Sequence, residues 1–165
     1  MTIGPVQMLV LGFAEPNFTG KIAAELERLK DSDTIRIIDV LVVKKELDGD
    51  LTIVQATDLT QDESMEFGAV VGGLIGLGAA GEEGMEAGAV AGAEALEDGR
   101  VFDEDEVWYV ADTIPPGTAA AIALIEHRWA IPLRSTILEA GGMLLADEWI
   151  HPVDLVAVGV AAAAE

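Results

Sequence analysis

The sequence predicts an α+β fold built on a ferredoxin-like sheet. The first sixty residues follow a strand–helix–strand–strand pattern, and the last third repeats a strand–helix–strand pattern. Between them lies a glycine-rich stretch, which contains no charged residue from Phe67 to Gly81. A chain of 165 residues is long enough to bury a core of its own. We therefore expect one α+β domain that is interrupted by an insertion.

The first part of the predicted domain covers residues 1–60. Residues 6–13 form a continuous apolar run, which is typical of a buried strand. A helix follows, because Ile22, Leu26 and Leu29 recur at helical spacing. Two strands come next, over 35–47 and 51–59, and they are joined by the turn Asp48-Gly49-Asp50. Arg36 and Asp39 mark exposed positions or a bulge in the first of these strands.

The second part covers residues 107–152 and leaves 153–165 as a C-terminal strand or tail. We expect a strand over 107–114, a turn at Pro115-Pro116-Gly117, and a helix over 119–140 that Pro132 kinks. Strands are expected over 143–150 and 153–160. Two strand–helix–strand units with right-handed crossovers place both helices on one face of the sheet, here with an extra hairpin strand.

The insertion, residues 61–106, carries two glycine stripes at intervals of four residues. Glycine costs about 1 kcal/mol relative to alanine at each helical position, so this spacing indicates close packing of helix backbones. We expect a helical hairpin with a turn near Gly81-Glu82-Glu83, packed on itself or on the same element of another subunit. Its contact residues, and the candidates for self-association, are Gly68, Gly72, Gly76, Gly84, Gly88 and Gly92.

The hairpin is not expected to span a membrane. As a helix, its 15 uncharged residues would reach about 22 Å, against about 30 Å of hydrocarbon. The second segment carries Glu86 and Glu94, whose burial in lipid would be costly. Peripheral association of the first segment remains open.

In these features the chain resembles a family of small bacterial proteins of unknown function, which carry general-stress or membrane-protein labels. The resemblance rests on the β-α-β-β start, the glycine stripes from Gly68 to Gly92 and the turn Pro115-Pro116-Gly117. It implies a ferredoxin-like domain that is interrupted by a glycine-rich helical hairpin, and it implies no catalytic residue. The acidic second segment departs from the more apolar family pattern.

Charge and composition exclude several classes of function. Thirty acidic and nine basic residues give a net charge of −21, which argues against binding to nucleic acids or anionic membranes. Fourteen of the acidic residues lie between 61 and 112. This charge suits either a solvated or salt-adapted surface, or one that binds cations or a basic partner. The chain has no cysteine, and its N-terminus has no secretory pattern, so we expect a cytoplasmic location.

No catalytic constellation is evident in the sequence. His127 and His151 are not expected to converge, and no nucleophile elbow or phosphate-binding loop occurs. The best metal candidates are Glu82, Glu83 and Glu86, although such a cluster also suits a solvated helix start. Trp108, Trp129 and Trp149 suit either a pocket or a core.

The sequence therefore predicts a non-enzymatic, self-associating structural or stress-associated protein without a cofactor, which forms a homo-oligomer through its glycine helices. The alternative is a module that binds a small ligand or a divalent cation. It would use the open sheet face with Trp108 or Trp149, or the three glutamates.

Overall fold

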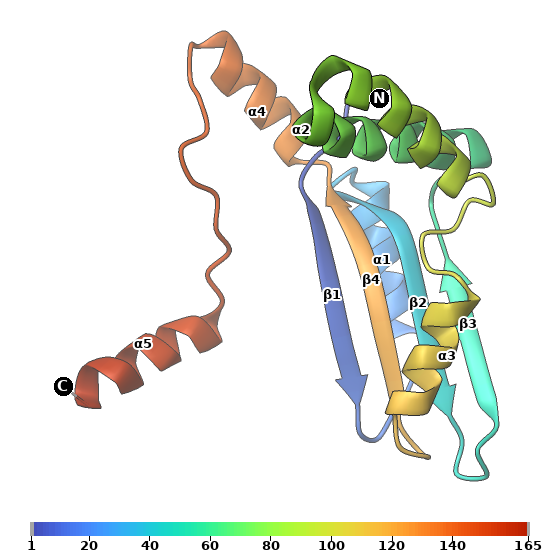
Figure 1. Ribbon diagram of the computed structural model, residues 1–165. Coiled ribbons are helices and arrows are strands. Elements are labelled where there is room, and N and C mark those ends of the chain that lie inside the picture. Colours follow the sequence, from blue (N-terminus) through green and yellow to red (C-terminus); the bar gives the residue numbers. More distant parts are fainter. Residues whose placement is uncertain (1, 165) are drawn as a thin grey trace. The chain divides into compact units, whose positions relative to one another are not determined.

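The α+β class is confirmed by a computed structural model, which describes residues 2–164 (Figure 1). The chain divides into two units between Pro132 and Leu133. The elements, in chain order, are β1 (Val6–Phe13), α1 (Lys21–Asp31), β2 (Ile35–Lys45), β3 (Leu51–Ala56), α2 (Gln61–Ala95), α3 (Glu104–Thr113), β4 (Ala119–His127), α4 (Ala130–Glu139) and α5 (Pro152–Ala164).

The four strands form one open sheet in the order β1-β4-β2-β3, and every neighbouring pair is antiparallel. As a result β1 and β2 run parallel to each other on either side of β4. In the same way β3 and β4 run parallel on either side of β2. Helix α1 connects the first of these split pairs, while α2 and α3 connect the second. The sheet therefore contains two interleaved crossover connections, one through α1 and one through α2 and α3.

The helices cover both faces of the sheet. Leu26 and Leu29 of α1 pack on the face that carries Ala123 and Ile125 of β4. On the opposite face, α3 packs on β2 and β4 through a cluster made of Leu41, Val43, Phe102, Val110 and Ala111, with Ile122 at its edge. In Figure 1, α1 lies behind the sheet and α3 in front of it. The prediction that the helices share one face is wrong.

The predictions for the first sixty residues are confirmed in element type and order. The two hairpin strands are shorter than expected, because β2 ends at Lys45 and β3 at Ala56. The register of β2 against β4 shifts between Ile37 and Asp39, which confirms a bulge at this point. Asp39 is nevertheless almost fully buried, at 1% exposure, and is not a solvated position.

The predicted strand over 107–114 is wrong, since these residues belong to α3. Asp103 caps this helix, and the Glu106 side chain in turn accepts from the Asp103 N–H, which is a capping box. Val107, Val110 and Ile114 also recur at helical spacing and face the sheet. The cap and the spacing outweigh the strand propensity of the aromatic and β-branched residues here.

The predicted helix over 119–140 is also wrong, because its first half is strand β4. Alanine favours a helix in isolation, yet β4 is paired along its length with β1 and β2. Tertiary pairing overrides propensity at this central position. Only Ala130–Glu139 is helical, and Pro132 lies in its first turn, where the missing N–H breaks no helical bond.

The two predicted C-terminal strands are absent from the described residues. Residues 143–150 form neither helix nor strand, and their apolar side chains Leu144 and Leu145 are exposed. Residues 153–160 lie in α5, which begins at Pro152 and whose first turn is fastened by a bond from the His151 N–H to Asp154 Oδ2 (2.7 Å). The predicted ferredoxin-like arrangement, with its second unit at residues 107–152, is therefore not confirmed.

Two buried carboxylates on the central strands, Asp39 and Glu126, form hydrogen bonds with segments that lie outside the sheet. Asp39 Oδ2 accepts bonds from Gln55 Nε2 and from the N–H groups of Val101 and Phe102, each at 2.9 Å. Glu126, which is fully buried, accepts from Arg36 Nε (2.9 Å) and from the Gly4 N–H (2.9 Å). Charge-assisted bonds of this kind are about twice as strong as neutral ones. Together the two groups tie the N-terminal segment and the segment before α3 to the central strands.

We predict that Asp39→Ala lowers the free energy of unfolding by roughly 3 kcal/mol, because it leaves buried N–H donors without an acceptor. Asp112→Ala, which removes an exposed carboxylate from α3, is the matched control and should change stability by less than about 0.5 kcal/mol. Urea denaturation followed by circular dichroism measures both values. Equal stability of the two variants would contradict the role assigned to Asp39.

Candidate functional site: the glycine hairpin and the pocket beside it

Helix α2 is a hairpin of two helical segments. Its start is fixed by a capping box, in which Thr60 Oγ1 accepts from the Glu63 N–H (3.2 Å) and Glu63 accepts from the Thr60 N–H (2.8 Å). The helical path breaks at Ala80 and Gly81. Gly81 has φ +67° and ψ −149°, a conformation that is open almost only to glycine. The break falls at the start of the turn that the sequence predicts.

The two segments meet through their glycines. The carbonyl oxygen of each partner glycine occupies the place where a side chain would stand, so an added Cβ would lie under 3.0 Å from backbone atoms. The contact is therefore backbone against backbone, and any larger residue would force the segments apart. The facing pairs are Gly68 with Gly92, Gly72 with Gly88 and Gly76 with Gly84.

The open end of the hairpin is rooted on the sheet, and its outer surface is exposed. Phe67, Val71 and Leu96 pack with Ile38 and Leu59 at the root. Gln61 Nε2 also donates to the Glu97 carbonyl oxygen (2.9 Å), which joins the two ends of the hairpin. Apolar side chains away from the root remain in solvent. We call them the outer apolar surface: Leu74, Ile75, Leu77, Met85 and Val90.

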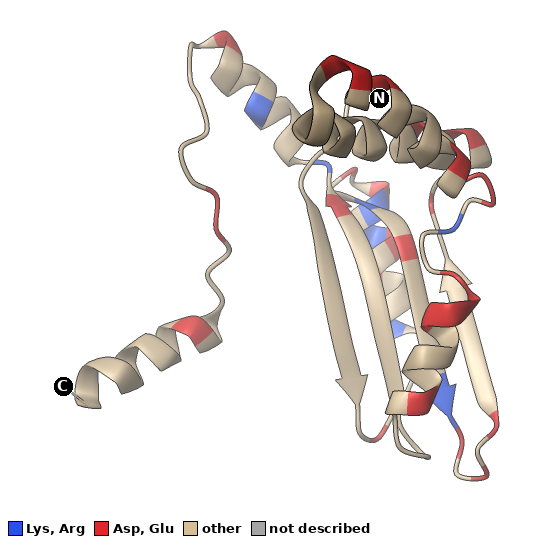
Figure 2. Cartoon of the chain, in the orientation of Figure 1, with Lys and Arg blue, Asp and Glu red and all other residues tan. Residues whose placement is uncertain are grey.

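Acidic residues lie at the turn of the hairpin (Figure 2). Glu82, Glu83 and Glu86 are all exposed there. Over residues 2–164, no group of three or more Asp, Glu or His side chains is arranged to hold a metal ion. The three glutamates thus lie close in sequence without forming a shared ligand set.

By length and composition alone, α2 is the one described helix that could cross a membrane. Its break divides the 35 residues into two segments. The second segment, after Gly81, would reach about 21 Å, and the uncharged part of the first, residues 67–81, about 22 Å, against about 30 Å of hydrocarbon. Insertion of the hairpin would also carry the glutamates of its turn into lipid. The geometry therefore gives little support to a spanning role.

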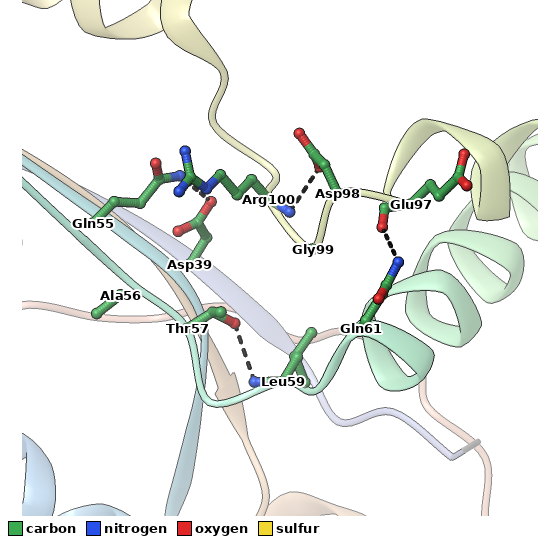
Figure 3. Close-up of a pocket in the computed structure, with 10 residues that line it drawn as sticks. All are labelled: Asp39, Gln55, Ala56, Thr57, Leu59, Gln61, Glu97, Asp98, Gly99 and Arg100. Atoms are coloured by element: carbon green, nitrogen blue, oxygen red, sulfur yellow. Dashed lines mark hydrogen bonds between the residues drawn. The ribbon is translucent and has the colours of Figure 1, made fainter.

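A pocket of about 370 Å³ lies between β2, β3 and the chain that follows the hairpin (Figure 3). The side chains of Asp39, Gln55 and Arg100 point toward one another at one side of it, and those of Gln61 and Asp98 border it elsewhere. Asp39 Oδ2 is saturated by three donors, whereas Oδ1 is buried and accepts no bond from any residue in the described part of the chain. This pocket combines polar donors, acceptors and charges of both signs.

The sequence singled out none of these pocket residues as a site. One signal was available, namely Asp39 as a lone acidic residue within a β-branched apolar run. A charge in such a run is either a solvated edge position or a buried group with dedicated partners. Gln55 and Arg100 lie beside Asp39 only because of the fold, and no local sequence pattern indicates that they share a pocket with it.

Of the histidines and tryptophans, His127 and Trp129 are hydrogen-bonded to each other. His127 Nδ1 accepts from Trp129 Nε1 (3.3 Å), and Nε2 bonds to Gln7 Oε1 (3.0 Å), so the imidazole is held by its neighbours. Partial burial lowers the pKa of His127 below its usual range, which favours the neutral ring. Trp108 lines a shallow hollow beside β3. Both His151 and Trp149 lie in the C-terminal unit and are exposed.

We predict that Gly72→Ala lowers the free energy of unfolding by about 1–3 kcal/mol, because the new methyl group would overlap the Gly88 carbonyl. Gly78→Ala lies in the same helical segment, where a Cβ meets no atom within 4 Å. This matched control should be neutral or stabilise the protein by up to about 1 kcal/mol. Thermal unfolding of both variants measures the difference. A loss of stability in Gly78→Ala equal to that in Gly72→Ala would contradict the backbone contact.

Comparisons of the chain with protein-family models, with curated proteins and with solved structures return no match. The function is therefore inferred from the chain's own residues and their arrangement.

Proposed function

We propose that the chain is a non-enzymatic, self-associating structural protein, and that the glycine hairpin is its assembly element. The observation that carries this proposal is the outer apolar surface. Ile75 is 69% exposed, Leu74 60% and Val90 61%. These residues lie on a hairpin that packs against the core of the sheet only at its root. Apolar surface of this kind, bordered by polar residues, marks an interaction site.

The facing glycines support this proposal indirectly. They pack within one chain, so they are not themselves the surface that another copy would meet. Their close contact fixes the two segments relative to each other and holds the outer side chains in one arrangement. A surface ordered in advance loses little conformational entropy when it binds. The glycines thus act as the internal support of the assembly surface.

Charge favours a second copy over an anionic partner. With a net charge of −21, the protein repels nucleic acids and acidic lipids, and its copies also repel one another. Apolar contact must overcome this repulsion, which salt screens. The Debye length falls from about 10 Å at 0.1 M salt to about 3 Å at 1 M. Association should therefore strengthen as salt is raised.

We predict that the double variant Leu74→Lys/Ile75→Lys has a smaller assembly mass than wild type in light scattering at 1 M salt. The matched control is Leu47→Lys, which changes an exposed leucine (85%) at the β2–β3 turn and should leave the mass unchanged. Wild type itself should show a larger mass at 1 M than at 0.1 M salt. A monomeric wild type at both salt concentrations, or an unchanged mass in the double variant, would overturn the proposal.

A second candidate function is the binding of a small cationic ligand in the Asp39 pocket. The observation in its favour is Asp39, which lines the pocket and whose buried Oδ1 accepts no bond from residues 2–164. Buried polar atoms almost always have a partner, so this oxygen suits a donor group or a cation from outside the chain. Asp98 and Glu97 add negative charge to the same pocket.

We predict heat on calorimetric titration with millimolar calcium or magnesium chloride if this second function holds. Asp98→Asn, which lines the pocket without supporting the fold through buried bonds, should weaken the binding. Glu83→Gln, on the hairpin turn, is the control and should leave the titration unchanged. Absence of heat at millimolar metal removes the divalent-cation version of this function.

A further inference from the structure

Within residues 2–132, strand β1 is an edge strand of the sheet along its whole length. It pairs with β4 on one side only, in a regular register from Val6–Glu126 to Phe13–Ala119 without a bulge. The first charged residue of the chain is Glu15, so the strand and the segment before it carry no charge. In Figure 2 the ribbon of β1 is tan from end to end, with no acidic or basic residue. Within a chain of net charge −21, this is a neutral strand eight residues long.

The hydrogen-bond register shows which backbone groups this edge offers. The His127 N–H donates to the Pro5 carbonyl oxygen (2.8 Å), which makes residues 5 and 127 a hydrogen-bonded pair. Bonded and non-bonded pairs alternate along an antiparallel ladder. The odd-numbered residues of β1 therefore bond to β4, and the N–H and C=O groups of the even-numbered residues point to the open edge: Val6, Met8, Val10 and Gly12.

Strand β1 itself has none of the sequence features that usually protect an edge strand from pairing with another strand. Charged side chains, prolines, bulges or short length normally blunt an edge strand. Within 6–13 there is no charge, no proline and no bulge. Met8 and Val10 are also exposed apolar side chains, at 63% and 65%. The opposite edge strand, β3, is shorter and lies between Asp50 and Asp58.

We propose that β1 pairs with β1 of a second copy, antiparallel and about a two-fold axis, so that two sheets become one continuous sheet of eight strands. Charge argues for a second copy as the occupant. An acidic partner is repelled, and two copies of this chain can approach closely where neither carries charge. The register that bonds residue 8 to residue 10 and residue 6 to residue 12 sets Leu9 opposite Leu9 at the axis.

This contact goes beyond the proposed function because it does not depend on the hairpin. It supplies a second self-complementary surface on a different part of the molecule. Two different two-fold contacts on one chain produce linear or ring-shaped assemblies, whereas either contact alone stops at a dimer. The assembly state then reports on each contact separately.

The first test removes one outward N–H without touching the bonds between β1 and β4. Val10→Pro does this, and proline is tolerated in an edge strand where its nitrogen faces solvent. We predict a smaller assembly mass in light scattering at 1 M salt, with an unchanged far-UV circular dichroism spectrum. Ile53→Pro changes an outward position of β3 and is the matched control, which should keep the wild-type mass.

The second test stays informative if the proline variant fails to fold. The wild-type chain has no cysteine, so Leu9→Cys introduces a single thiol. A non-bonded antiparallel pair has Cα atoms about 4.5 Å apart, which suits a disulfide. Leu9→Cys should form a cross-linked dimer on mild oxidation. Leu11→Cys is the control, because two copies of residue 11 would lie about 14 Å apart along the strands in this register.

The outcomes separate the two contacts. Cross-linking through Leu9→Cys but not Leu11→Cys, together with a reduced mass for Val10→Pro, supports the paired edge. A full-sized assembly in Val10→Pro, or no cross-link in Leu9→Cys, overturns it. Loss of mass only in Leu74→Lys/Ile75→Lys upholds the hairpin contact and overturns the edge contact, and loss only in Val10→Pro does the reverse.

Discussion

The Asp39 carboxylate is the interaction on which the rest of the structure depends. Its Oδ2 atom accepts hydrogen bonds from the Gln55 side chain on β3 and from the N–H groups of Val101 and Phe102, in the segment that follows the hairpin. That segment has to return the chain from α2 to the sheet before α3 can begin. Because Asp39 sits at the bulge of a central strand, its carboxylate turns into this connection. The hairpin root, the α3 cluster and the pocket all border the same group.

The sequence predicted the fold best where local patterns and tertiary pairing agree. The apolar run of β1, the Asp48-Gly49 turn and the amphipathic α1 are confirmed because each pattern is complete within its own segment. The prediction failed at β4, where alanines favour a helix but two neighbouring strands impose a sheet. It failed at α3 because residues 107–114 are rich in residues that favour strands, whereas the acidic residues before them cap a helix.

The candidate site shows the same division. The glycine stripes are periodic, so their spacing alone predicted a hairpin and the place of its turn. Whether they meet within one chain or between two depends on the three-dimensional path, which the structure gives as pairs within the chain. The Asp39 pocket gathers residues that are 16 and 61 positions away along the chain, at Gln55 and Arg100, and no sequence pattern links them.

The facing glycines have a consequence for how the protein responds to its surroundings. Their contact involves only main-chain atoms, with no titratable or charged group at the interface. Changes of pH or salt concentration should therefore have little effect on the stability of this contact. The acidic exterior behaves in the opposite way, since its mutual repulsion changes with each of these conditions. The contact between the two hairpin segments is therefore expected to be independent of pH and salt, whereas the repulsion between acidic surface groups depends on both. In the proposed assembly, changes of ionic strength would alter how strongly two copies associate, while the hairpin keeps its shape.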